Sequence, residues 1–197
     1  MNTYSHILMG RVLCGYLEKH CGIRLERKSF VLGNVLPDYV PSFLLKPHFG
    51  KNNIRHIQKT LRQIAKCKPG EPKRTSRLLG ILCHFYSDSL CYAHSEAFTG
   101  NIPEHMQYEK QLHAYFTEHL KEITACRFML PPCMDRNAAG LYLRFENIHR
   151  SYTAVQPAFA NDLLYAMMAC LDAIVSIYGH TAAIPEAPAF FVALRAV

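Results

Sequence analysis

The chain has 197 residues, of which half are hydrophobic and 19% are charged. This length suits one folded domain with a substantial core, and the lack of Gly/Ser-rich or repeated stretches excludes a flexible linker or an internal array. The formal net charge is +7 at pH 7. Nine Lys or Arg residues lie within 51–77 beside one acid, Glu71, and this favours an anionic partner such as a phospholipid surface or nucleic acid.

Three features of the sequence indicate the cellular compartment: its beginning, its most apolar segment and its cysteines. The beginning of the sequence lacks the basic segment, apolar run and small-residue cleavage site of a secretory signal. The most apolar segment, 158–178, is interrupted by Asn161, Asp162 and Asp172, which predicts a buried helix rather than a transmembrane segment. The eight cysteines contain no CxxC pair and are expected to be reduced thiols. We therefore expect a cytoplasmic protein.

Hydrophobic periodicity predicts helices along nearly the whole chain. The expected helices span residues 3–20, 26–36, 51–67, 76–93, 103–124, 135–150 and 158–178. The second of these should stop before Pro37, because the segment 37–50 holds three prolines and a glycine and is expected to form an irregular loop. Since no segment alternates with period two, the predicted class is all-α, in a single domain covering 1–197.

The predicted 51–67 helix is amphipathic. Its apolar stripe and its basic stripe lie on different faces, with Ile57 and Leu61 in the first and Arg55, Lys59 and Arg62 in the second. The simpler interpretation is the solvated face of a surface helix. The alternative is a surface that contacts lipid or nucleic acid.

Two pairs of histidine and carboxylate, each at the i, i+4 spacing of a helix, are candidate metal ligands. His84 and Asp88 are separated by four residues, as are His105 and Glu109, so each pair projects from one helical face. His94 lies between the pairs. Imidazole and carboxylate groups on adjacent turns form a preorganised zinc chelate. Each pair taken alone is common on exposed helices, and a buried His84–Asp88 pair also fits a hydrogen-bonded core contact.

Further candidate ligands occur upstream, where each is weak evidence alone. Together with the two pairs they form an ordered series: His6, Asp38 at the end of GNVLPD, His48, His84, Asp88, His94, His105 and Glu109. This order and both spacings resemble the zinc-dependent phospholipase C family, over roughly residues 1–110. That family shares its all-α bundle and tri-zinc cluster with the fungal single-strand nucleases.

The resemblance implies a role for each residue. Asp38, His48, His84 and Asp88 would hold one zinc, and His94, His105 and Glu109 a second. Asp88 would bridge to a third zinc, which His6 and the N-terminal amine and carbonyl complete in the family.

The resemblance is weakest at the N-terminus. Secreted members expose a tryptophan there, whereas this chain has none; Met1 would take that place, since Asn2 disfavours removal of the methionine. Asp38 and Asp88 are the implied catalytic carboxylates, with Asp38 either a ligand or a general base. Tyr39 would line the headgroup pocket, or pack against the core.

The expected function is zinc-dependent hydrolysis of a phosphodiester with two to three zinc ions. A phospholipase C that releases diacylglycerol and a phosphorylated headgroup is the first hypothesis, with peripheral membrane contact through 51–77. A nuclease or nucleotidase using the same cluster is the second. The third is a non-catalytic helical protein that zinc stabilises.

Overall fold

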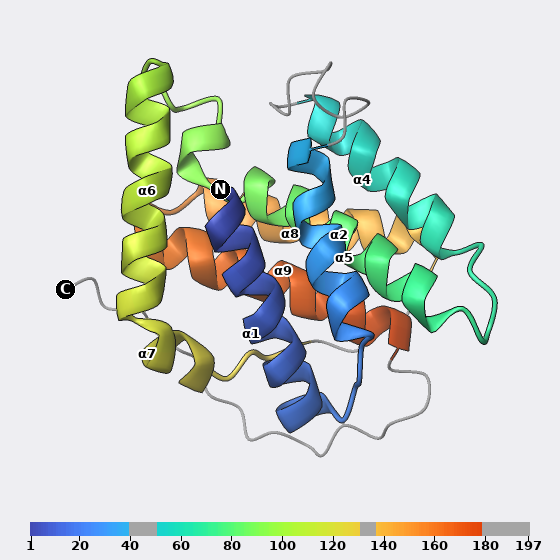
Figure 1. Cartoon of the computed structure of the whole chain (residues 1–197). Helices are drawn as coiled ribbons and strands as arrows, with labels where there is room; N and C mark the ends of the chain where they lie inside the picture. Colours follow the sequence, from blue (N-terminus) through green and yellow to red (C-terminus); the bar gives the residue numbers. More distant parts are fainter. Residues whose placement is uncertain (40–50, 131–136, 179–197) are drawn as a thin grey trace.

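The computed structural model describes residues 1–39, 51–130 and 137–178, and most of these residues are helical (Figure 1). Eight α-helices and one 3-10 helix occur in these ranges, and no strand is present there, which confirms the all-α prediction. The helices are α1 (Thr3–Cys21), α2 (Arg27–Tyr39), α4 (Lys51–Ile64), α5 (Pro72–Ser89), η1 (Tyr92–His94), α6 (Ile102–Glu118), α7 (Leu120–Ala125), α8 (Ala138–Thr153) and α9 (Phe159–Tyr178).

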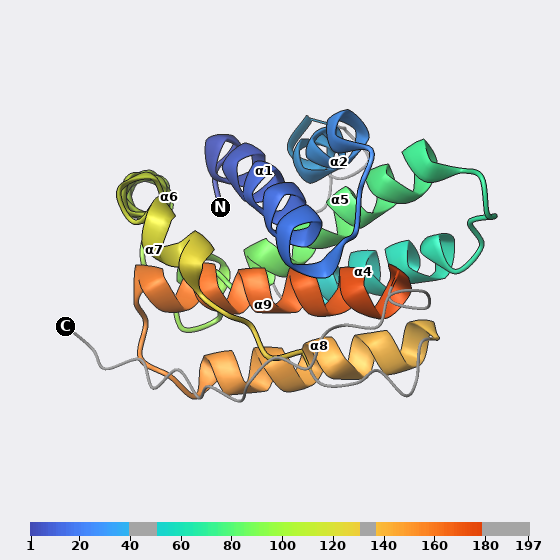
Figure 2. The same ribbon diagram turned by 90° about the horizontal axis from the view of Figure 1, so that it is seen from below.

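The helices pack in layers around α5 and α9 (Figures 1 and 2). Figure 2 shows α1 and α2 above, α9 below them, and α8 on the far side of α9. Helix α5 contacts both α2 and α9, and its Leu79, Leu82 and Phe85 are fully buried. Burial of large apolar side chains on a central helix is the main stabilising contribution to such a core.

Helix α9 is long and apolar enough, by length and composition, to cross a membrane. In its most apolar window, however, 67% of the residues are buried inside the protein, where it packs against α1, α5 and α8. Both of its acids have partners: Asp172 pairs with Arg144 of α8, and Asp162 accepts hydrogen bonds from tyrosines. The predicted buried helix is confirmed.

Several helix boundaries differ from those predicted, including α4, which ends at Ile64, and α8, which spans Ala138–Thr153. Helix α2 continues through Pro37 to Tyr39; a proline in the last turn removes only one intrahelical hydrogen bond there, so the helix tolerates it. Helix α5 spans Pro72–Ser89 rather than 76–93, and His94 belongs to η1. The predicted 103–124 helix is two helices, interrupted at His119, whose backbone is not helical.

The amphipathic pattern of α4 is borne out in part. Ile57, Leu61 and Ile64 are buried, but Ile54 is exposed and Asn53 is buried beside the stripe. The basic side chains Arg55, Lys59 and Arg62 are exposed. All seven cysteines within the described ranges are free thiols, as expected.

Candidate metal centre

The His84–Asp88 pair of α5 lies inside the protein. The Nε2 atom of His84 is 3.2 Å from Asp88 Oδ2, and both side chains are almost fully buried. The geometry follows from the spacing of four residues, which places both groups on the same face of one rigid helix. The pair therefore presents a fixed imidazole and a fixed carboxylate to the same interior space.

Asp88 directs its two carboxylate oxygens at different groups. Oδ2 faces His84, whereas Oδ1 lies 3.1 Å from His6 Nε2, 2.6 Å from the Met1 backbone nitrogen and 3.8 Å from His94 Nε2. The rings of His6 and His84 stack with their centroids 4.0 Å apart. One carboxylate thus stands between two sets of nitrogen donors, which is the arrangement that a bridging ligand requires.

A close crossing of α2 and α5 orients the ring of His84. Its Nδ1 lies 2.9 Å from the backbone carbonyl oxygen of Asn34. A carbonyl only accepts, so Nδ1 carries the proton and Nε2 keeps its lone pair when the ring is neutral. The crossing depends on Gly33 and Gly80, since a Cβ on Gly80 would overlap the carbonyl oxygen of Phe30.

Asp38 reaches the same space from the last turn of α2. Its Oδ1 is 3.7 Å from His84 Nε2, and its Oδ2 accepts a hydrogen bond of 2.9 Å from the hydroxyl of Thr3. The ligand atoms of His6, Asp38 and His84 lie within 4.8 Å of one another. Tyr39 follows Asp38 with its ring exposed, so the interpretation that it packs against the core is wrong.

A second group forms where η1 meets α6. The ligand atoms of His94, His105 and Glu109 lie within 4.8 Å of one another. Glu109 Oε1 is 2.9 Å from His94 Nε2 and 3.3 Å from His105 Nε2. The N-terminal capping box of α6, formed by Asn101 and Glu104, fixes the first turn of the helix just before His105.

Asn2 fixes the Met1 nitrogen between the two groups. The side chain of Asn2 accepts from the backbone N–H of Ser5 and so caps α1, and it donates to the carbonyl oxygen of Glu109. The Met1 nitrogen lies 2.8 Å from His94 Nε2 and 3.1 Å from Glu109 Oε1. Because it also lies 2.6 Å from Asp88 Oδ1, it stands between Asp88 and the second group.

Burial and neighbouring charges shift the pKa values of the candidate ligands in both directions. Burial opposes protonation of His84, but Asp88 and Asp38 raise its pKa above the ordinary value. Burial, together with the neighbouring His84, lowers the pKa of His6 to about 4, so its ring is neutral near pH 7. Burial opposes ionisation of Glu109, but the hydrogen bond from His94 and the Met1 amine lower its pKa to about 2. Burial likewise opposes ionisation of Asp88, yet the Met1 amine and nearby histidines hold its pKa well below the ordinary value.

These donors fit zinc. The groups that converge are imidazole nitrogens and carboxylate oxygens, which are the donors that zinc takes in catalytic sites. A carbonyl oxygen holds the second nitrogen of His84, as is usual for a metal-ligating histidine. The sequence-predicted residues His6, Asp38, His84, Asp88, His94, His105 and Glu109 are brought together; His48 lies outside the described residues.

Asp162 of α9 forms hydrogen bonds with the two segments that carry the second group. It is fully buried, and its Oδ2 accepts hydrogen bonds from the backbone N–H of Tyr92 (3.1 Å) and the hydroxyl of Tyr108 (2.9 Å). Its Oδ1 accepts from Tyr152 at 2.7 Å. Tyr92 begins η1, which ends at His94, and Tyr108 precedes Glu109. Sequence reasoning missed this anchor, together with Thr3 and Asn34, because none of the three has a motif spacing.

A family model for zinc-dependent phospholipase C matches residues 5–161, which is most of the chain. The chain belongs to the zinc-dependent phospholipase C family. Membership implies a phosphoric diester hydrolase that uses zinc, with phospholipid as the substrate class. Comparison with curated proteins and with solved structures finds no match.

Proposed function

We propose that this phospholipase C hydrolyses phosphatidylcholine-like lipids to diacylglycerol and a phosphorylated headgroup, at a cluster of two to three zinc ions. The observation that carries the proposal is the position of Asp88, whose two oxygens face separate sets of donors. A carboxylate shared in this way suits a multinuclear site, and paired metals are a common device for phosphodiester hydrolysis.

In this proposal His84, Asp38 and Asp88 would hold one zinc, together with His48 as the family resemblance implies. His94, His105 and Glu109 would hold a second. His6 and the Met1 nitrogen would hold a third, with Asp88 as their shared carboxylate. Bound zinc supplies Lewis acidity and lowers the pKa of a coordinated water.

The protein's own residues orient the reaction. Asp38 is the more exposed of the two implied catalytic carboxylates, and the Thr3 hydroxyl fixes one of its oxygens. The other oxygen then lies toward the cluster, where it either holds a metal or takes a proton from the attacking water. Asp88 is buried and ionised, which suits a ligand rather than a proton acceptor. Tyr39 is exposed beside Asp38 and is proposed to contact the headgroup.

Metal analysis combined with a substrate panel tests the proposal. The expected result is two to three zinc ions per chain and release of phosphocholine from a monomeric short-chain phosphatidylcholine, with both lost or strongly reduced in Asp88→Asn. Asp172→Asn is the matched control, because Asp172 is a buried carboxylate that pairs with Arg144 away from the cluster. Retention of zinc and activity in Asp88→Asn would contradict the bridging role.

The panel also separates the other hypotheses. Cleavage of single-stranded DNA without cleavage of lipid would indicate a nuclease. Full zinc content with no turnover of any phosphodiester would indicate a zinc-stabilised helical protein without this activity.

A further inference from the structure

Large apolar side chains are exposed where the ligand-bearing helices reach the surface. On α6, Ile102 is 77% exposed and Met106 is 65% exposed. Tyr4 in the first turn of α1 is 71% exposed, and Tyr39 at the end of α2 is 65% exposed. Single exposed apolar residues are ordinary on protein surfaces. These four are unusual in their location, because each is within three residues of a candidate ligand.

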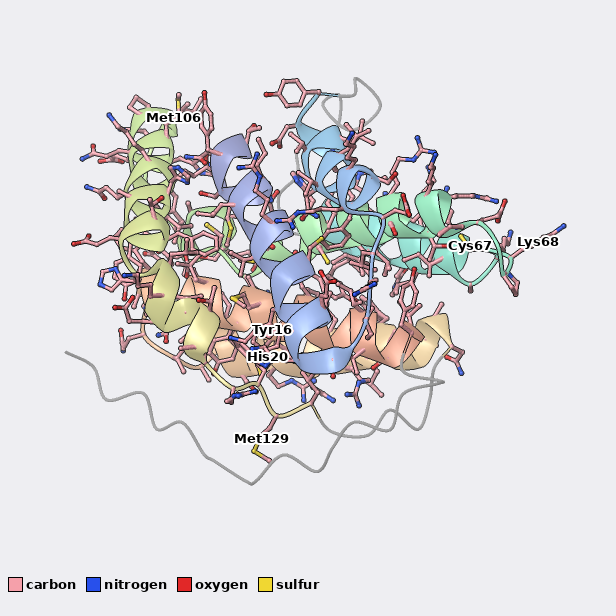
Figure 3. The ribbon with its side chains drawn as sticks, turned by 60° about the horizontal axis from the view of Figure 1, so that its bottom comes forward. Tyr16, His20, Cys67, Lys68, Met106 and Met129 are labelled. Atoms are coloured by element: carbon pink, nitrogen blue, oxygen red, sulfur yellow. The ribbon has the colours of Figure 1, made fainter. Side chains whose placement is uncertain are left out.

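On α6 the exposed apolar residues lie directly beside the ligands. Ile102 precedes His105 by three positions, and Met106 precedes Glu109 by three positions, so each is the surface neighbour of a ligand one turn away. Ile102 and Met106 are also neighbours of each other, at a spacing of four. Figure 3 shows Met106 at the outer end of α6, at the opposite end of the molecule from Met129.

Tyr4 extends the same surface onto α1. Its ring centroid lies 5.9 Å from that of His113, which shares the face of α6 that carries Met106 and Glu109. We call Tyr4, Tyr39, Ile102 and Met106 the apolar rim. The one acid between Ile102 and Met106, Glu104, is engaged in the capping box, where its Oε2 accepts from the Asn101 N–H.

Three candidate ligands reach solvent on the same helices that carry Tyr39, Ile102 and Met106. His6, His84 and Asp88 are buried, whereas Asp38, His105 and Glu109 keep part of their side-chain surface exposed. Asp38 is followed by Tyr39, and His105 by Met106. A phospholipid that brings its phosphate to the exposed ligands would therefore have its apolar part next to exposed apolar side chains.

We propose that the apolar rim docks the enzyme on the surface of a phospholipid bilayer and places the metal centre over the headgroups. This inference rests on the proposed function. Side chains of this kind partition into the boundary between headgroups and acyl chains, and full burial of each strengthens binding by about 10-fold or more.

The part of the rim on α6 is a different surface from the basic 51–77 region. Helices α4 and α6 lie on opposite sides of the molecule in both ribbon views (Figures 1 and 2). The basic side chains of α4 face solvent while Ile57 and Leu61 are buried. Docking through the rim therefore does not use the apolar face of α4.

The experiment compares one enzyme on two physical forms of the same substrate. The test variant is Ile102→Gln/Met106→Gln, since glutamine suits a helix and neither residue is a candidate ligand. The matched control is Leu143→Gln, which removes an apolar side chain that is 55% exposed on α8, on the far side of α9 (Figure 2). Each is assayed on phosphatidylcholine vesicles and on monomeric short-chain phosphatidylcholine, with zinc content and vesicle co-sedimentation measured in parallel.

The expected result is a loss of roughly 10- to 100-fold in vesicle binding and vesicle hydrolysis for the double variant, with zinc content and monomer hydrolysis unchanged within about twofold. An unchanged vesicle activity, or an equal loss in Leu143→Gln, would overturn the proposal. So would a change of oligomeric state in light scattering without a change in vesicle binding, because the rim would then be an interface between copies.

An Arg55→Gln/Lys59→Gln variant that alone loses vesicle binding would assign docking to α4 instead and would also overturn the proposal. Failure of the proposed function has a separate signature, which is the absence of monomer hydrolysis in the unmodified enzyme. The co-sedimentation arm still tests docking in that case.

Discussion

The carbonyl oxygen of Asn34 lies 2.9 Å from Nδ1 of His84, so a backbone atom of α2 sets the orientation of a histidine on α5. The two helices come this close because Gly33 and Gly80 face each other where they cross. The geometry of the metal centre therefore depends on two residues that carry no functional group.

Substitution of Gly80 by alanine tests this dependence. The new methyl group would overlap the Phe30 carbonyl oxygen, so α2 and α5 must separate and Asn34 must move away from His84. We expect a loss of about 1–3 kcal/mol in the free energy of unfolding, together with weaker zinc binding, measured by thermal unfolding and by titration with zinc. Gly15→Ala is the control, because open space surrounds Gly15 in α1, and it should be neutral or stabilising by about 0.5–1 kcal/mol.

Removal of the Thr3 hydroxyl should impair the reaction more than the fold. Thr3→Val deletes the donor to Asp38 Oδ2, and loss of such an outer-shell partner lowers activity or metal affinity by roughly 10- to 100-fold. Thr3→Ser restores the donor and should recover most of the activity. Steady-state kinetics at saturating zinc would report the effect, and unchanged activity in Thr3→Val would mean that the hydroxyl is not required.

The anchor formed by Asp162 predicts a selective loss of metal. Asp162→Asn replaces one of the two carboxylate oxygens that accept from Tyr92, Tyr108 and Tyr152 by an NH2 group. We expect this to cost about 1–3 kcal/mol and to loosen η1, which ends at His94. We expect lower zinc stoichiometry as well as a lower melting temperature. Asp172→Asn, which breaks the ion pair with Arg144, should lower the melting temperature while zinc stays bound. Equal zinc loss in both variants would reduce Asp162 to a stabiliser of the fold.

Extension of the N-terminus tests whether the Met1 nitrogen binds zinc, without a change to any side chain. Addition of one glycine before Met1 converts an amine that lies 2.6 Å from Asp88 Oδ1 into an amide. An amide nitrogen is a poor zinc ligand, so about one equivalent of zinc should be lost, as measured by mass spectrometry of the native protein. A glycine added after Val197 provides the control. Unchanged zinc content in both proteins would exclude the nitrogen as a ligand.

The sequence predicts the helices and the convergence of the ligands, but not the contacts that orient them. The spacing of four residues suffices for His84–Asp88 and His105–Glu109, because a single helix determines both geometries. The contacts of Thr3 with Asp38, and of Asp162 with Tyr92, join residues far apart along the chain, and no local pattern encodes them.

The boundary at Pro37 was predicted wrongly for a related reason. Local propensity disfavours a helical proline, but the structure keeps α2 helical for one more turn, and this turn presents Asp38 to the cluster. The exposure of Tyr39 follows from the same extension. Tertiary packing against α5 outweighed the local preference at this position.

The candidate ligands come from α1, α2, α5, η1 and α6, whereas α8 and α9 contribute none among the described residues. Metal bound at this centre would act as a cross-link between segments up to 108 positions apart, from Met1 to Glu109, in a chain whose described cysteines form no disulfide. Such a link restricts the unfolded chain most strongly over long loops. Hydrogen exchange in α1, α2, α5 and α6 should therefore slow more on zinc binding than exchange in α8.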